Sequence, residues 1–240
     1  MKKTYLICLL PLLFIFSGCA GSLASQVFDD QLIADPYENI NRNVYAFNDA
    51  LDKAILKPVA TGYDKATPSF MKTGVSNFLS NLREPRNFLN NLLQLNMEGT
   101  VQSLGRFAFN STFGLAGVLD IMSEAGIEQK NEDFGQTLAV WGLKPGAYVY
   151  LPLFGPSTVR DTVGRVGDYL MLNPTSFIED PKLQTSHTVI NVIDVRASLL
   201  PLDSILEKQV DTYNFVRSGY EQSRMNSVFN GNPPELEEDF

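Results

Sequence analysis

Prolines and glycines divide this chain into many short segments, and this division limits the possible folds more than any other feature of the sequence. The chain has 13 prolines and 17 glycines among its 240 residues. Between them, apolar residues recur three and four positions apart, which is the spacing of one face of a helix. In the first segment this stripe consists of Tyr37, Ile40, Val44, Phe47, Leu51 and Ile55. Strand–helix alternation and long repeats are absent, so we predict a mainly α fold of short amphipathic helices.

Local signals predict where these helices begin and end. Asp35-Pro36 is a strong helix start, with Asp35 as the cap, and Lys57-Pro58 is expected to end that helix. Further helices are expected after Thr67-Pro68, after Pro85, after Gly99, over 134–141, from a cap at Ser157 to about Leu170, from about Ser186 to Leu200, and from about Asp203 through Phe229. Only Ala147 to Leu153 has strand character, and Pro152 limits it to an edge or an irregular segment. We expect core packing for Phe78, Phe88 and Phe107.

The first residues have the pattern of an export signal. Lys2 and Lys3 precede an apolar run over 4–16, which is shorter than the ~20 residues of a spanning helix. The run closes on Phe16-Ser17-Gly18-Cys19, which resembles the lipobox of bacterial lipoproteins, with Phe16 where that motif usually has Leu. The resemblance implies that residues 1–18 are a signal peptide and that Cys19 carries covalent acyl chains. The alternative is a plain signal peptide that happens to contain a cysteine.

The residue after the cysteine bears on localisation. It is Ala20, and not the Asp that commonly retains such proteins at the inner membrane. The resemblance therefore implies a lipid-anchored protein on the periplasmic face of the outer membrane, held by acyl chains that contribute ~0.8 kcal/mol per buried CH₂. We expect residues 19–34 to be the anchor and tether, 35–230 one helical domain, and 231–240 an acidic disordered tail.

Composition excludes several kinds of protein. Of the two cysteines, Cys8 would leave with the leader and Cys19 would carry lipid, so no thiol remains for a disulfide. The net charge is −8, which argues against nucleic acid as a partner and against attraction to anionic headgroups. Contact with a membrane must therefore be apolar.

Residues typical of an active site are scarce. The single histidine, His187, has no nucleophile motif around it, and the sequence holds no cysteine–histidine cluster for a metal and no phosphate-binding glycine pattern. The charged pairs Arg160-Asp161 and Glu84/Arg86 are expected to be ion pairs or solvated charges. We predict that the protein is not an enzyme and has no cofactor besides its acyl chains; a hydrolase built on His187 is the alternative.

One apolar, glycine-containing stretch covers residues 113–122. It is too short to span a bilayer. A close-packed core segment and a membrane-facing loop both fit its composition. For the second reading, the candidate membrane-facing residues are Phe113, Leu115, Val118 and Leu119.

Several stretches, in this order, resemble the MlaA/VacJ family of outer-membrane lipoproteins. They are residues 35–48, residues 56–60, Ser76-Asn77-Phe78-Leu79-Ser80-Asn81-Leu82-Arg83-Glu84-Pro85, Arg106-Phe107, residues 110–114 and 117–120, and Phe134-Gly135-Gln136-Thr137-Leu138 with its continuation to Arg160-Asp161. The resemblance implies a ring of helices in the inner leaflet of the outer membrane. It also implies a central amphipathic channel, through which phospholipid mislocalised to the outer leaflet passes to a soluble periplasmic carrier. A trimeric porin is a further implied partner.

The first helix is the candidate channel wall or gate. On its mixed stripe, the residues expected to act there are Asn41, Arg42, Val44, Phe47 and Asn48. The stripe alone is also compatible with an ordinary core helix. For the whole protein, the alternative is a structural or adhesion lipoprotein with a filled helical core and no channel.

Overall fold

The computed structural model describes residues 33–171 and 180–234. The expected signal peptide, Cys19, most of the expected tether and the end of the acidic tail lie outside the described residues. The described chain is mainly helical with one small hairpin, and this confirms the predicted fold class.

The elements follow one another as short helices. They are α2 (Glu38–Leu51), the π-helical turn η2 (Asp52–Leu56), α3 (Lys57–Ala66), α4 (Ser69–Asn81), α5 (Glu84–Leu93), α6 (Met97–Thr112), α7 (Ile121–Glu124), α8 (Phe134–Val140), β1 (Tyr148–Leu151), β2 (Gly155–Thr158), α9 (Val159–Met171), α10 (Pro181–Leu199), the 3₁₀ turn η4 (Leu200–Leu202), α11 (Asp203–Leu206) and α12 (Thr212–Val228). The two strands are antiparallel, with Tyr148 opposite Thr158 and Leu151 opposite Gly155.

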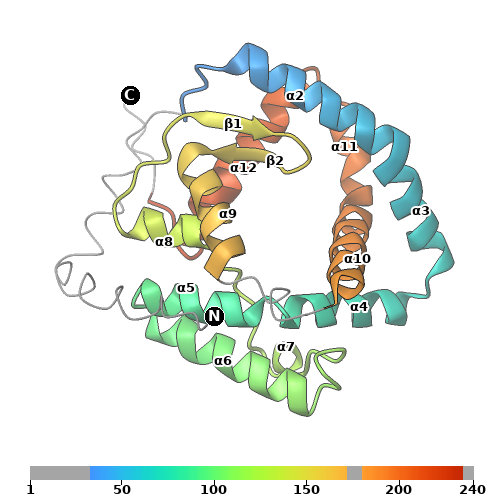
Figure 1. The fold of residues 1–240 in the computed structure, drawn as a ribbon, viewed down its shortest axis with the longest axis vertical. Helices are drawn as coiled ribbons and strands as arrows, with labels where there is room; N and C mark the ends of the chain where they lie inside the picture. Colours follow the sequence, from blue (N-terminus) through green and yellow to red (C-terminus); the bar gives the residue numbers. More distant parts are fainter. Residues whose placement is uncertain (1–32, 172–179, 235–240) are drawn as a thin grey trace.

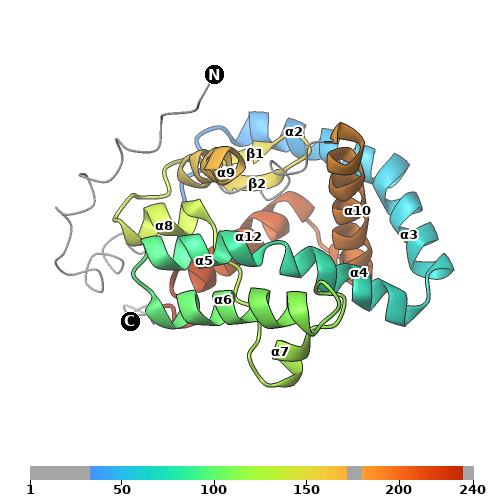
Figure 2. The ribbon, with the colours of Figure 1, turned by 60° about the horizontal axis from the view of Figure 1, so that its bottom comes forward.

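Figure 1 shows these elements arranged as a ring. The helices α2 and α3 form one side, α4 and α5 a second, and α8, α9 and the hairpin a third, while α10 stands inside. Figure 2 shows α6 alongside α5 and α7 below them. None of the helices in the described part of the chain combines the length and the hydropathy needed to cross a bilayer.

The interior of this ring-shaped fold is unusually polar. Among the described residues the buried apolar side chains are few: Ala60, Leu79, Leu138, Ala139, Tyr148, Ala197, Tyr213 and Val228. Many more buried side chains are polar or charged, and large apolar side chains are exposed on most helices. A water-soluble domain normally buries its large apolar side chains and leaves charge outside. This chain shows the reverse arrangement.

The α5–α6 pair shows how the polar core is held. Arg106 of α6 donates from Nε to Glu84 Oε1 at 2.6 Å and from Nη2 to Asp120 Oδ2 at 2.7 Å. Arg106 and Glu84 are almost fully buried, and paired charges are the form in which charge is tolerated inside a protein. On the opposite face of α6, Val101 and Leu104 are exposed. The helix is therefore amphipathic with its polar side inward.

Both predicted ends of the first helix are wrong. The helix begins at Glu38, and the Asp35 side chain instead accepts hydrogen bonds from Asn41 and Tyr213. It also continues past Lys57-Pro58, because η2 widens the helix by one i→i+5 turn just before Pro58. Pro58 has no N–H to donate. This loss is tolerated because Pro58 lies in the first turn of α3, directly after the widened turn.

The apolar stripe of this helix does not face a core. Ile40 is 63% exposed and Phe47 is 57% exposed, so the ordinary core-helix reading is wrong. The expectation of core packing is likewise wrong for Phe78 and Phe107, which are both exposed, while Phe88 is half-buried. Helical periodicity identifies an apolar face without telling whether protein or another apolar medium covers it.

Two boundaries in the second half also differ from expectation. Ser157 lies in β2 and is not a helix cap; the Thr158 hydroxyl accepts from the Asp161 N–H at 3.1 Å at the start of α9. The long helix expected from Asp203 is interrupted after α11 and restarts at Thr212, with Asp211 as its cap. In both cases the polar side chain of the residue just before the helix, Thr158 or Asp211, accepts a hydrogen bond from a free N–H group of the first turn.

Candidate functional site

Two amides of α2 hold the hairpin. Asn41 donates from Nδ2 to the Tyr148 carbonyl at 3.1 Å and accepts from the Tyr150 N–H at 2.9 Å. Asn48, about two turns further along α2, makes the same kind of contact: it donates to the Leu151 carbonyl and accepts from the Leu153 N–H, both at 2.9 Å. These two predicted site residues therefore join α2 to β1 and its turn.

The turn of the hairpin is held from its other side by Arg165 of α9. Its guanidinium donates to the carbonyls of Phe154 and Pro156, each at 3.0 Å. Leu153 and Phe154 at the tip are 69% and 71% exposed, and Figure 1 shows the tip pointing toward the middle of the ring. The sequence offered no signal for Arg165, because its partners are backbone carbonyls.

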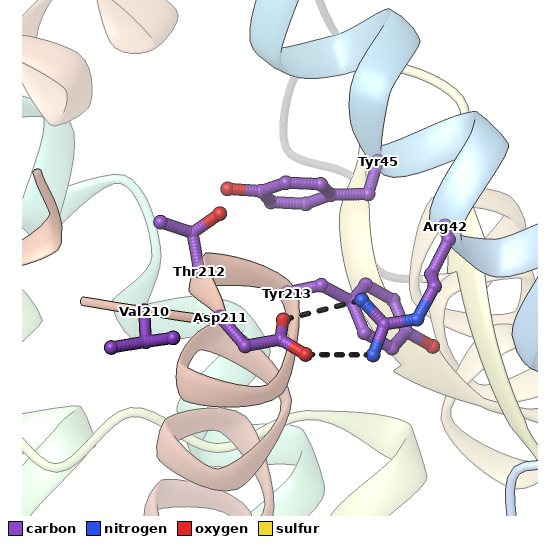
Figure 3. Close-up of a pocket in the computed structure, with 6 residues that line it drawn as sticks. All are labelled: Arg42, Tyr45, Val210, Asp211, Thr212 and Tyr213. Atoms are coloured by element: carbon purple, nitrogen blue, oxygen red, sulfur yellow. Dashed lines mark hydrogen bonds and ion pairs between the residues drawn. The ribbon is translucent and has the colours of Figure 1, made fainter.

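The adjoining flank of α2 lines a pocket of about 460 Å³ with the start of α12. Figure 3 shows Arg42 and Tyr45 on one side and Asp211, Thr212 and Tyr213 on the other. The Arg42 guanidinium holds Asp211 by two hydrogen bonds of 2.8 and 3.2 Å and lies 4.5 Å from the centroid of the Tyr213 ring. Sequence reasoning missed Tyr45, Asp211 and Tyr213, since contacts 169 residues apart leave no local pattern.

Arg42 and Asp211 form an ion pair in which each group stabilises the charge of the other. The hydrogen bonds that Arg42 donates to Asp211 and then to Glu38 raise the pKa of Arg42, and the bond from Arg42 lowers the pKa of Asp211. Both side chains remain more than one-third exposed. An exposed pair of this kind contributes little to stability because water competes for both groups, so it can exchange partners at little cost.

The five residues predicted as channel or gate do not form one cluster. Asn41 and Asn48 face the hairpin, Arg42 faces α12, Val44 is half-buried and Phe47 is exposed. All five lie on one helix at the edge of the ring (Figure 1). A role for them in a channel stays a prediction.

Residues 113–120 form turns and not a packed helix. Leu115 and Ala116 have left-handed φ values of 53° and 58°, followed by Gly117 at 93°. Gly117 is required there, because an added Cβ would lie 2.5 Å from the Asn81 Cβ. The exposed fractions are 69% for Phe113, 69% for Leu115, 40% for Val118 and 49% for Leu119. The buried-core alternative is thus wrong, and lipid contact stays a prediction.

His187 is the residue on which the alternative of a hydrolase depends. His187 is half-buried; burial, and then the nearby Arg83, lower its pKa. No hydroxyl is hydrogen-bonded to it within residues 33–171 and 180–234. No group of three or more histidine, cysteine or carboxylate side chains suited to a metal ion occurs in that part of the chain. The expected Arg160–Asp161 pair is present at 2.9 Å.

Comparison with known proteins decides the family. The family model described as "MlaA lipoprotein" matches residues 33–227. The chain belongs to the MlaA lipoprotein family. The match covers the whole ring, from the residues before α2 to the last turn of α12.

Relatives support the MlaA assignment. The intermembrane phospholipid transport system lipoprotein MlaA of Escherichia coli K12 is 35% identical over 220 residues, which cover 89% of this chain and 84% of the relative. The protein of the same name from Shigella flexneri is also 35% identical. An uncharacterized protein of Rickettsia typhi is 36% identical over 82% of this chain and 78% of the relative.

A solved structure has the same fold. It comes from work on the structural basis for maintenance of bacterial outer membrane lipid asymmetry. It is 32% identical in sequence, covers 83% of this chain and 100% of the solved chain, and has a TM-score of 0.72. The resemblance to MlaA inferred from sequence motifs is therefore confirmed by family model, relatives and fold.

Proposed function

We propose that this protein is an outer-membrane lipoprotein that lets phospholipid pass through its ring. In this proposal it takes phospholipid mislocalised to the outer leaflet and passes it to a soluble periplasmic carrier, and so maintains lipid asymmetry. The observation that carries the proposal is the reversed polarity of the fold, with buried charge and exposed apolar side chains. The names of its MlaA relatives, which refer to intermembrane phospholipid transport, support the same role.

Reversed polarity is favourable in a lipid leaflet. Apolar surface left in water costs about 25 cal/mol per Å², whereas acyl chains solvate it. Helices satisfy their own backbone groups, so amphipathic helices can lie within one leaflet without crossing the bilayer. Exposed residues such as Phe70, Val101 and Leu170 would face the acyl chains.

Anchoring is a second part of the proposal. Cleavage after residue 18 would leave Cys19 as an acylated N-terminus, joined through residues 19–34 to the helical domain. Several acyl chains give a stable anchor without a transmembrane helix. The anchor places the protein on the periplasmic face, where a trimeric porin and a soluble lipid carrier are the proposed partners.

The proposed transfer needs no catalytic group. Movement of an intact lipid breaks no covalent bond, and an excess of phospholipid in one leaflet together with a tight-binding carrier supplies the driving force. We therefore propose a transporter and not an enzyme. Replacement of His187 by alanine is expected to leave lipid asymmetry unchanged, whereas a hydrolase acting through this histidine would lose its activity.

Substitution on α2 tests the passage. Phe47→Glu, or deletion of Ala46 and Phe47, should change the amount of phospholipid in the outer leaflet while the protein is still exported. Asn43→Glu is the matched control, because Asn43 is an exposed polar residue of the same helix. Unchanged outer-leaflet phospholipid in both Phe47 variants would count against the proposal.

Solubility distinguishes the alternative of a structural or adhesion lipoprotein. With Cys19→Ser, a protein with a filled core and an ordinary surface would be monodisperse without detergent. The proposed transporter should still bind detergent micelles through its exposed apolar side chains. Size-exclusion chromatography with and without dodecyl maltoside separates the two outcomes.

A further inference from the structure

Two neighbouring arginines have no carboxylate partner in the described part of the chain. Each of six other arginines lies within 4 Å of a carboxylate: Arg42, Arg106, Arg160, Arg196, Arg217 and Arg224. Arg83 instead donates to the neutral Asn191 Oδ1 at 2.8 Å, and the Arg86 Nε is buried without a hydrogen-bond partner. Glu84, expected beside Arg86, points to the other side of α5 and pairs with Arg106.

These two arginines lie where α4 meets α5, and Arg83 contacts α10. Arg83 precedes the first residue of α5, and Arg86 lies in its first turn. His187 and Asn191 are one turn apart on α10, and Asn191 holds Arg83. Figure 1 shows α10 inside the ring, next to α4. Arg83 therefore faces this inner helix.

Two aspartates lie near this pair, but neither forms an ion pair with it. Burial, and then the nearby Arg86, lower the pKa of Arg83, while Asp194 acts in the opposite direction. Asp194 accepts a hydrogen bond from the Tyr63 hydroxyl, and Asp168, which lies near Arg86, accepts from the Phe134 N–H. Half-buried like charges are unfavourable without a counterion. No ion pair in the described part of the chain neutralises Arg83 or Arg86, and this leaves room for an anion from outside.

An apolar pocket opens on the adjoining flank of α10. Its volume is about 570 Å³, and it is lined by Pro181, Lys182, Thr185, Ser186, Val189 and Ile190. Ser186 and Ile190 immediately precede His187 and Asn191 in sequence. Successive residues of a helix are about 100° apart, so the pocket and Asn191, which holds Arg83, lie on neighbouring faces of α10.

We propose that Arg83 and Arg86 bind a phosphate group, and that the pocket on α10 takes the apolar tail of the molecule that carries it. Guanidinium groups bind phosphate oxygens through paired, charge-assisted hydrogen bonds, more specifically than lysine does. The combination of phosphate and apolar tail is that of a phospholipid. The inference deepens the proposed function, and it rests on that function for the source of the lipid.

Calorimetric titration of the purified protein in dodecyl maltoside tests the site. The titrants are dihexanoylphosphatidylethanolamine, its tail-free analogue glycerophosphoethanolamine, and inorganic phosphate. The short-chain lipid should bind most tightly, and Arg83→Gln/Arg86→Gln should weaken it by about tenfold or more, as expected for lost charge-assisted hydrogen bonds. Equal binding by wild type and this variant overturns the site, and equal binding of lipid and inorganic phosphate overturns the role of the pocket.

Two comparisons keep the result independent of folding and of net charge. Lys65→Gln/Lys144→Gln removes the same charge at exposed positions and should leave affinity unchanged. In the wild-type protein, the short-chain lipid should protect Arg83 and Arg86 from phenylglyoxal but leave the exposed Arg165 reactive. Equal modification of the pair with and without lipid overturns the proposal even where the variant fails to fold.

The same variants separate this site from the proposed function. Loss of lipid binding in Arg83→Gln/Arg86→Gln with normal outer-membrane asymmetry in cells would support the phosphate site and contradict its use in transport. Retained binding with lost asymmetry would support transport and overturn the site.

Discussion

Asn41 and Asn48 each hold the hairpin backbone with both polar atoms of the amide. One bonds the Tyr148 carbonyl and the Tyr150 N–H, the other the Leu151 carbonyl and the Leu153 N–H. Seven residues are about two turns of a helix, so both amides leave the same face of α2. One face of one helix thereby sets the position of β1 and of the hairpin tip.

Asn48→Ala should loosen the hairpin turn. The Leu153 N–H loses its acceptor and the Leu151 carbonyl loses its donor, which costs about 1 kcal/mol of folding free energy. Hydrogen exchange at the Leu153 amide should become faster, with little change in the helices. Asn43→Ala, on an exposed face of the same helix, is the control. Slow exchange at Leu153 in Asn48→Ala would contradict this role.

Arg106→Met should strongly destabilise the fold. It leaves Glu84, which is 1% exposed, as a buried charge without its partner, at a cost of about 3–5 kcal/mol. Denaturant unfolding measures the loss. In a double-mutant cycle, Glu84→Gln/Arg106→Met should be less destabilised than the sum of the single variants, because the unpaired charge is gone. Strict additivity would show that the pair is not coupled.

Glu132 should make stability fall between pH 5 and pH 8. Burial raises its pKa to about 7 from an ordinary 4.5, against a smaller opposite effect of the hydrogen bond from Gln94. The folded state then holds the proton more tightly than the unfolded state. This stabilisation is complete below about pH 4.5 and is lost as the pH rises through 7, by roughly 3 kcal/mol at most.

Thermal unfolding of Glu132→Gln across that range provides the measurement. The variant should show a smaller decrease in Tm than the wild type, whereas Glu128→Gln, at an exposed position nearby, should follow the wild type. His187 contributes with the opposite sign near its own titration, since its pKa is lowered, so only the difference between variant and wild type isolates Glu132. Parallel curves for Glu132→Gln and wild type would refute the assignment.

Leu115→Asn should have opposite effects on folding and on membrane binding. Leu115 has a left-handed φ of 53°, a conformation that costs roughly 1 kcal/mol for most residues and less for Asn. Stability should therefore hold or rise slightly. Binding to phospholipid vesicles should weaken if the exposed leucine enters lipid, where its side chain contributes about 1.5–3 kcal/mol.

The unstrained, exposed Val101 supplies the comparison for this effect. Val101→Asn should weaken vesicle binding without any gain in stability, because Val101 lies within α6. Flotation of both variants with liposomes, after replacement of Cys19 to remove the anchor, measures the change. Unaltered flotation of Leu115→Asn would place this turn away from the membrane.

Features set by neighbouring residues were predictable from the sequence. The helix over 134–140 begins with a capping box in which Asp133 and Gln136 bond each other's backbone N–H groups, a pattern visible within four residues. The strand at Tyr148–Leu151 was also predictable, because its strand character lies in its own residues. Its partner Gly155–Thr158 was not, because these residues lack strand character and become a strand only by pairing.

The amino-acid sequence by itself determined that this chain makes short amphipathic helices, and its motifs identified the family. Local propensity, capping and proline positions act within a few residues, so they can be read in order along the chain. Only the tertiary structure decided which way each face points and which charges are paired. Arg42 pairs with Asp211, which lies 169 residues away in the sequence. Glu84 pairs with Arg106 and not with Arg86, which is nearer in the sequence. Periodicity records that a helix has two faces, but the surrounding elements and medium determine which of them is buried.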